Sequence, residues 1–202
     1  MGYAAKLPGL TADAFLAWEA AQTERHEFVR GEVFAMAGAE DRHVTVTGNV
    51  YMSLRQALAG TPCRTYMTDM KVQPLGSSDF FYPDVLVTCS AADRTSALVK
   101  HEPRLLVEVL SPGTAAYDRG EKFAHYRRIA TLEEFALIDL DSRRTDVYRK
   151  GADGLWVLHP CERGEPVTLA SVGVTVGAET LFAEVDEPLD SPPGSPPAPA
   201  AA

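Results

Sequence analysis

The stretch that decides the fold consists of three segments: F-F-Y-P-D-V-L-V-T-C at 80–89, L-L-V-E-V-L-S-P-G-T at 105–114 and Y-D-R-G-E-K-F-A-H-Y at 117–126. The first two are short apolar runs of the kind that form buried strands, and each carries one carboxylate in its middle, Asp84 or Glu108. Burying an ionised carboxylate costs several kcal/mol unless a positive group meets it. Two such carboxylates on neighbouring strands would form an oxygen site for a divalent cation. We therefore expect the function of the chain to reside in this stretch.

The helix predicted after the second strand would supply the positive group. Side chains alternate across a strand, so Glu108 lies on one face of the strand at 105–110. On a helix from about 116 to 129, residues four positions apart share one face. The residues at this spacing are Asp118, Lys122 and Tyr126. A tight loop between strand and helix would bring Lys122 back over Glu108, so the sequence predicts two carboxylates and one ammonium at the same place.

The rest of the chain predicts an α/β domain with a mixed sheet. The longest helical pattern covers 40–59, and its apolar positions are Val44, Val46, Val50, Leu54 and Leu58. The segment 90–103 predicts a loop with at most one helical turn. The remaining expected elements are a short helix at 10–15 capped by Thr11, a hairpin over 25–36 that turns at Arg30-Gly31, and strands at 63–72, 134–140, 144–150 and 155–159.

Length and composition fit one domain over residues 1–185, followed by an acidic, Pro-rich tail over 186–202 that cannot pack. No run of about 18 uncharged apolar residues occurs, so we expect no membrane span. The formal net charge of −9 disfavours nucleic acid as a partner. Part of the acidity gathers near the tail, however, and the segments 119–128 and 143–150 are locally basic. The charge balance therefore weakens a DNA partner without excluding it.

Three isolated cysteines, Cys63, Cys89 and Cys161, show no C-x-x-C pair. Two of them lie in apolar, strand-like runs, where a free thiol behaves as a small hydrophobe. An odd number of isolated cysteines argues against a zinc site and against a disulfide framework. The first residues, M-G-Y-A-A-K-L-P, lack the apolar core of a secretory signal. We therefore predict free thiols and a cytoplasmic location.

An ordered set of motifs resembles a known family. Pro83-Asp84 is followed by E-V-L-S-P at 108–112 and by D-R-G-E-K-F-x-x-Y at 118–126. The likeness extends over about residues 10–156, and its further motifs are H-E-F-V-R-G-E-V at 26–33, His43, T-D-M-K-V at 68–72 and Y-R-R-I-x-x-L-E-E-F at 126–135. This set is similar to the Uma-two type of restriction-endonuclease-like proteins, within the PD-(D/E)XK nuclease superfamily. The resemblance implies a restriction-endonuclease-like core, with a mixed sheet flanked by helices and an N-terminal helix and hairpin as an extension.

The resemblance also implies a metal-dependent endonuclease that hydrolyses phosphodiester bonds in DNA. Asp84 and Glu108 would be the metal ligands, with the backbone carbonyl of Val109 as a third, for Mg²⁺ or Mn²⁺. The chain departs from the superfamily pattern at Leu110, where a lysine is expected two residues after the acid. In this family the basic role belongs to the following helix, which would make it Lys122. Its ammonium would orient the attacking water or stabilise charge on the phosphate.

Several alternatives stay open at the level of sequence. Glu108 and Lys122 can form a purely structural buried pair, and Lys122 can pair with Asp118 on a solvated helix face. The supporting residues of the candidate site, each with a packing or capping role as its alternative, are Glu27, His43, Asp118 and Tyr126. A catalytically silent interaction or nucleic-acid-binding module and a hydrolase of RNA are the alternative functions. A homodimer stays open as well, because a two-fold pair would place two sites across a duplex.

Overall fold

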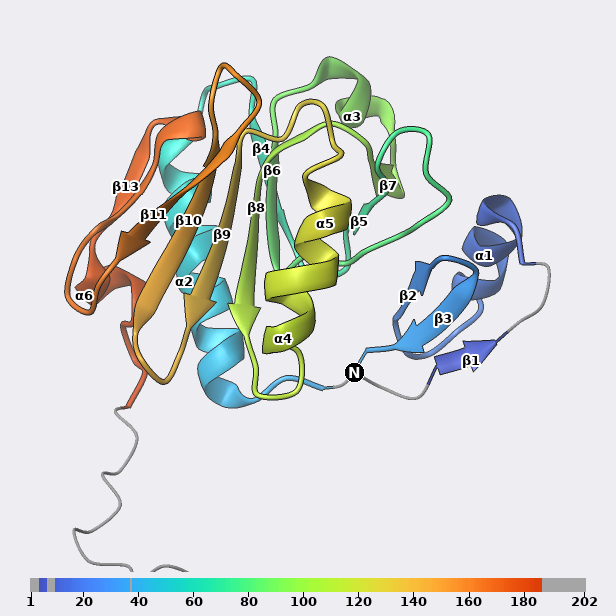
Figure 1. The fold of residues 1–202 in the computed structure, drawn as a ribbon, viewed down its shortest axis with the longest axis horizontal. Helices are drawn as coiled ribbons and strands as arrows, with labels where there is room; N and C mark the ends of the chain where they lie inside the picture. Colours follow the sequence, from blue (N-terminus) through green and yellow to red (C-terminus); the bar gives the residue numbers. More distant parts are fainter. Residues whose placement is uncertain (1–3, 7–9, 37, 187–202) are drawn as a thin grey trace, which may run out of the picture.

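A six-stranded mixed sheet forms the centre of the computed structural model, which describes residues 4–6, 10–36 and 38–186 (Figure 1). The strands lie in the order β11-β10-β9-β8-β6-β4. Their bounds are β4 Arg64–Met67, β6 Val85–Thr88, β8 Pro103–Leu110, β9 Glu134–Asp139, β10 Arg144–Lys150 and β11 Trp156–Cys161. Strands β8 and β9 run parallel, and the other neighbouring strands of this sheet run antiparallel. The predicted α/β domain with a mixed sheet is confirmed.

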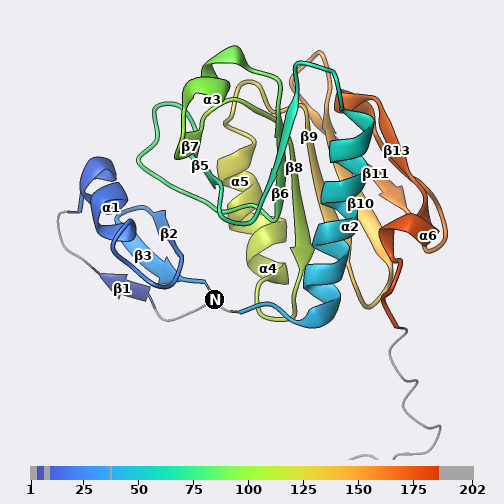
Figure 2. The same cartoon turned by 180° about the vertical axis from the view of Figure 1, so that it is seen from behind.

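Helices cover both faces of the sheet. Helix α2 (Asp41–Ala57) lies on one face, and the segment that contains α4 (Ala115–Tyr117) and α5 (Phe123–Tyr126) lies on the other (Figures 1 and 2). Side chains alternate along β8 as predicted, so Val107 packs in the cluster with α2 and Leu106 packs in the cluster with Tyr126. The first cluster is completed by β12 (Val167–Leu169), β13 (Val174–Val176) and α6 (Ala178–Leu181). Glu108 therefore lies on the α5 side of the sheet.

The N-terminal extension contains the predicted helix and hairpin, and a further strand makes the hairpin a three-stranded sheet. Helix α1 (Ala12–Glu19) begins after Thr11, whose hydroxyl accepts a hydrogen bond from the Ala14 amide at 3.3 Å. Strands β1 (Ala4–Lys6), β2 (His26–Val29) and β3 (Glu32–Ala35) form a sheet in the order β1-β3-β2. Arg30 and Gly31 both have positive φ, at 52° and 82°, as a tight hairpin turn requires. The hairpin joins the core through a β-bridge between Phe28 and Phe80.

Two predicted strands are shorter than the sequence pattern indicated. In the segment 80–89 the regular strand β6 begins only at Val85, because Phe80 and Phe81 pair instead with Phe28 and with Val72. The segment 63–72 is interrupted at Thr68, whose φ of 46° ends β4, and resumes as the short strand β5 (Lys71–Val72). Strand β5 pairs with β7 (Val99–Lys100), which follows a short helix α3 (Ala91–Thr95). The predicted loop at 90–103 thus holds both a helix and a strand.

The two predicted long helices also differ from expectation. The helix expected at 116–129 is interrupted by a π-helical turn, Asp118–Lys122, between α4 and α5. Such turns carry one extra residue and often occur at functional sites. In α2 the predicted apolar position Val44 is 55% exposed, whereas Thr47 is buried at 1%. The packing stripe of this helix consists of Val46, Val50 and Leu54, and Val44 lies outside it.

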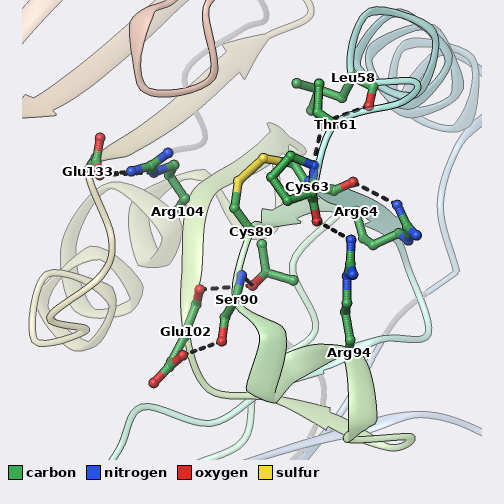
Figure 3. Close-up of a disulfide and its surroundings, with 12 residues drawn as sticks. Leu58, Thr61, Cys63, Arg64, Cys89, Ser90, Arg94, Glu102, Arg104 and Glu133 are labelled. Carbon is green, nitrogen blue, oxygen red and sulfur yellow. Dashed lines mark hydrogen bonds and ion pairs between the residues drawn. A yellow bond between two sulfur atoms is a disulfide. The ribbon is translucent and has the colours of Figure 1, made fainter.

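A disulfide joins Cys63 and Cys89, so the prediction of free thiols was wrong for this pair (Figure 3). Cys63 precedes β4 and Cys89 follows β6, and the register of these strands, which places Arg64 opposite Thr88, brings the two cysteines together. Only Cys161 is free among the cysteines, and it is partly buried. The cysteines therefore no longer support the cytoplasmic location, which stays a prediction.

Helices in the described part of the chain lack the length and apolar character needed to cross a membrane. Apart from Asp186, the predicted tail at 186–202 lies outside the described residues. The division into one domain and a tail stays a prediction.

Candidate active site

A cleft of about 540 Å³ opens at the carboxyl end of β8. Its walls come from the hairpin β2–β3, from the start of α2, from the loop after β8 and from α4 with the π-helical turn. In Figures 1 and 2, α2 and α4 approach this end of β8 from opposite faces of the sheet. The predicted site residues that line the cleft are Glu27, His43, Asp84, Glu108, Val109, Asp118 and Lys122. Residues that are far apart in the sequence thus line one cleft.

Lys122 lies directly over Glu108. Its Nζ atom is 2.9 Å from Oε1 of Glu108, and the hydroxyl of Tyr126 donates a hydrogen bond to the same oxygen at 2.8 Å. Lys122 comes from the π-helical turn and Tyr126 from α5, so the helix after β8 supplies both contacts. All three side chains are buried. The predicted approach of Lys122 to the strand of Glu108 is present in the structure.

Two further carboxylates contact the same ammonium. The Nζ atom of Lys122 is 3.2 Å from Oε1 of Glu27 and 3.7 Å from Oδ1 of Asp118. Glu27 comes from β2 and also accepts a hydrogen bond from the amide of Tyr82 at 3.1 Å. Asp118 lies one turn before Lys122, in the same π-helical turn. The N-terminal hairpin therefore supplies part of the site.

One ammonium among several carboxylates sets the protonation of the site. Burial raises the pKa of Glu108 well above its ordinary value, although the charge of Lys122 partly opposes this. Burial also disfavours the charge of Lys122, but the carboxylates of Glu108 and Glu27 outweigh burial and raise the pKa of its ammonium well above the ordinary value. Lys122 is therefore protonated at neutral pH. Its single charge is shared among three acids.

Asp84 lies immediately before β6 and forms a second polar group in the cleft. Its Oδ2 atom accepts a hydrogen bond from the amide of Val109 at 2.7 Å and lies 3.3 Å from Nε2 of His43. The backbone carbonyl of Asp84 accepts from the amide of Thr68 at 3.0 Å, which fixes the chain here. Burial lowers the pKa of His43, but the neighbouring Asp84 outweighs burial and raises it above the ordinary value. Asp84 and His43 thus form a pair beside the end of β8.

The structure brings the predicted residues together as two groups rather than as one cluster. One group is Asp84 with His43, and the other is Lys122 with Glu27, Glu108 and Asp118. Within the described residues, no three His, Cys, Asp or Glu side chains are grouped closely enough to hold a metal ion by themselves. Two side-chain carboxylates that face one cleft nevertheless match the oxygen ligands that Mg²⁺ uses when it keeps several waters.

Thr47 and Tyr117 are among the cleft residues that sequence reasoning missed. Both line the cleft, and the side-chain oxygen of each is buried without a hydrogen-bond partner in the described structure. Thr47 follows His43 by one helical turn, which places the two on the same face of α2. Tyr117 opens the third segment quoted above and directly precedes Asp118. The position of each residue beside a predicted site residue could therefore have identified it from the sequence.

Comparison with known proteins now identifies the family. A family model named Uma2 and described as a putative restriction endonuclease matches residues 12–179. The chain belongs to the Uma2 family. It is 33% identical over 178 residues to an uncharacterized protein of Synechocystis sp., and the alignment covers 88% of this chain and 94% of that protein. A second uncharacterized protein of the same organism is 35% identical over 151 residues, which cover 74% of this chain and 85% of that protein.

A solved structure shows the same fold as this Uma2 member. It is described as a putative nuclease from Anabaena variabilis, with a TM-score of 0.72 and 16% sequence identity, and the match covers 85% of this chain and 97% of that chain. At this identity the likeness shows the fold alone. The restriction-endonuclease-like fold that the sequence predicted is confirmed.

Proposed function

We propose that this Uma2 protein is a metal-dependent endonuclease that hydrolyses phosphodiester bonds in DNA. The observation that carries the proposal is that Asp84 and Glu108 line one cleft while Lys122 contacts Glu108 at 2.9 Å. The description of the family as a restriction endonuclease supports nucleic acid as the substrate. If Glu108 and Lys122 formed only a structural ion pair, the fold would not require a cleft lined by a second carboxylate, Asp84.

The charge of the cleft fits a divalent cation. The acids that line it are Glu27, Glu40, Asp84, Glu108 and Asp118, against Lys122 and His43 as basic residues. Asp84, Glu108 and the carbonyl of Val109 would hold Mg²⁺ or Mn²⁺, which prefer oxygen ligands. The contacts described above fall on Oδ2 of Asp84 and Oε1 of Glu108, so we expect Oδ1 and Oε2 to face the cation. A cation there would polarise the phosphoryl oxygen and lower the pKa of the attacking water.

Lys122 would act through its charge. Because its ammonium is protonated at neutral pH, it can donate hydrogen bonds but cannot take a proton from water. It would therefore orient the attacking water or stabilise the negative charge that develops on the phosphate. Glu27 and Asp118 would hold the ammonium in place from two sides, and Tyr126 would fix the carboxylate of Glu108.

Cleavage of supercoiled plasmid DNA tests the proposal. We expect nicking with Mg²⁺ or Mn²⁺, none with a chelator, and rates at least about a hundredfold lower for Asp84→Asn and Glu108→Gln, because each replaces a charged ligand by a neutral one of the same shape. Glu133→Gln, which changes a carboxylate outside the cleft, is the matched control and should cleave at the wild-type rate. Equal cleavage by wild type and both cleft variants would contradict the proposal. Cleavage of an RNA strand but of no DNA would favour the RNA alternative.

A further inference from the structure

Two residues that line the cleft carry a buried hydroxyl that has no partner in the described structure. The side-chain oxygens of Thr47 and Tyr117 are buried from solvent and accept or donate no hydrogen bond there. Both residues line the cleft that holds Asp84 and Glu108. Thr47 comes from α2 and Tyr117 from the end of α4, so the two approach the carboxyl end of β8 from opposite faces of the sheet (Figures 1 and 2).

A buried hydroxyl without a partner is costly, and native structures keep few of them. The other hydroxyls that line the same cleft are either paired or, at Thr68, on a residue that is exposed to solvent. Tyr82 donates to Oε1 of Glu19 at 2.8 Å, and the hydroxyls of Ser111 and Thr114 lie 3.0 Å apart. Thr47 and Tyr117 thus carry hydroxyls that are both buried and unpaired, and an unsatisfied group in a native site calls for a ligand or an ordered water.

The two basic side chains that line the cleft are already engaged. The ammonium of Lys122 is already shared by three carboxylates, and His43 is engaged by Asp84. The non-bridging oxygens of a phosphodiester only accept hydrogen bonds, so a bound phosphate needs donors besides a cation. Burial and the nearby Glu27 carboxylate raise the pKa of the Tyr117 hydroxyl, which keeps its proton available to donate at neutral pH.

We propose that the hydroxyls of Thr47 and Tyr117 donate hydrogen bonds to the phosphate oxygens of the bound nucleic-acid strand. This inference rests on the proposed nuclease function and adds the residues that hold the substrate phosphate. The two hydroxyls would bind the nucleic-acid strand from opposite sides of β8, while Asp84 and Glu108 face the cation. They are substrate-binding residues, distinct from the carboxylates and the ammonium of the proposed mechanism.

The test removes each hydroxyl without changing the shape of the side chain. The variants are Thr47→Val and Tyr117→Phe. Thr65→Val is the matched control, because the Thr65 hydroxyl is also buried without a partner but Thr65 itself does not line the cleft. Replacing an unsatisfied hydroxyl by an apolar group of similar shape is neutral or stabilising, so all three variants should keep or raise the wild-type Tm.

Binding is measured by fluorescence anisotropy with a short single-stranded DNA oligonucleotide and Ca²⁺, after a gel has shown that the oligonucleotide stays intact. A hydrogen bond to a charged group carries enough free energy for an affinity change of about tenfold or more. We therefore expect the oligonucleotide to bind about tenfold or more weakly to Thr47→Val and to Tyr117→Phe, and with wild-type affinity to Thr65→Val. Calorimetry with Mn²⁺ should give wild-type metal affinity for all three.

Wild-type oligonucleotide affinity in both cleft variants would overturn the inference, because the hydroxyls would then be hydrated by water alone. A lower Tm in the cleft variants than in Thr65→Val would also overturn it, since that result assigns the hydroxyls a structural role. Wild-type protein that binds Mn²⁺ but no oligonucleotide overturns the inference while leaving the metal site in place. Wild-type protein that binds no Mn²⁺ contradicts the proposed function itself.

Discussion

Glu108 and Lys122, which both line the cleft, form a buried ion pair with Nζ of Lys122 2.9 Å from Oε1 of Glu108. Breaking a buried pair by removing one partner is strongly destabilising, because the remaining charge is left uncompensated. Here the ammonium of Lys122 also contacts the carboxylates of Glu27 and Asp118, so it neutralises part of the charge of three carboxylates. The free carboxylate charge in this cleft can be balanced by a cation from solution.

Replacing Lys122 by alanine should separate catalysis from metal binding. We expect Lys122→Ala to abolish turnover while Mn²⁺ affinity, measured by calorimetry, stays nearly intact, because the ammonium is not a ligand. The lost ion pairs should lower the free energy of unfolding by about 3–5 kcal/mol, which urea denaturation can measure. Saturating Mg²⁺ should recover part of this loss. A folded variant that no longer binds Mn²⁺ would contradict the role assigned to Lys122.

The hairpin residue Glu27 should stabilise the site from the N-terminal extension. Glu27→Ala removes a contact to Lys122 and leaves the buried amide of Tyr82 without its acceptor, so we expect a loss of about 1–3 kcal/mol in the free energy of unfolding. Glu27→Gln keeps an oxygen that can accept from Tyr82 and should lose less. Glu24→Ala, at an exposed position before the hairpin, should melt like wild type. Equal Tm values for all three variants would refute a role of the hairpin in the site.

The disulfide between Cys63 and Cys89 predicts a thiol count. Unreduced protein in denaturant should give one thiol per chain with Ellman's reagent, and reduced protein should give three. In the folded protein Cys161 should react slowly, because burial raises the pKa of its thiol. Under oxidising conditions Cys63→Ser should lower the free energy of unfolding by about 2–4 kcal/mol, whereas Cys161→Ser should lower it by less. Three reactive thiols before reduction would show that the pair is not joined.

The strands and the acids were predictable because their signals are local. Two acids stand out in the sequence: a glutamate inside the apolar run of β8 and the aspartate of a Pro-Asp before β6. Because side chains alternate between the two faces of a strand, the sequence also shows which residues share a face with the glutamate. The position of Lys122 followed from the spacing of the next helix. The hairpin turn at Arg30-Gly31 was equally local, since these two residues lie between two runs of alternating apolar residues.

The missed features depend on tertiary contacts. Cys63 and Cys89 meet only through the register of β4 against β6, across a sequence separation of 26, and no spacing rule shows this. Val44 fits the apolar pattern of α2, but the neighbouring segments leave it exposed at the cleft. The π-helical turn at 118–122 interrupts a continuous helical pattern, and its end residues, Asp118 and Lys122, form an ion pair inside the site. Whether a hydroxyl such as that of Thr47 has a hydrogen-bond partner likewise depends on how the side chains pack in the folded protein.

Calorimetric titration of Mn²⁺ at millimolar concentration, on wild type and on Glu108→Ala, tests the central claim most directly. The claim is that Asp84 and Glu108 form a site for a divalent cation. We expect the wild-type protein to bind Mn²⁺ and Glu108→Ala to lose that binding, with Glu133→Gln as the control that retains it. If the wild-type protein binds no Mn²⁺ even with a DNA duplex present, the claim is contradicted. Glu108 would then be a structural partner of Lys122, and the role of an interaction module would explain the cleft better.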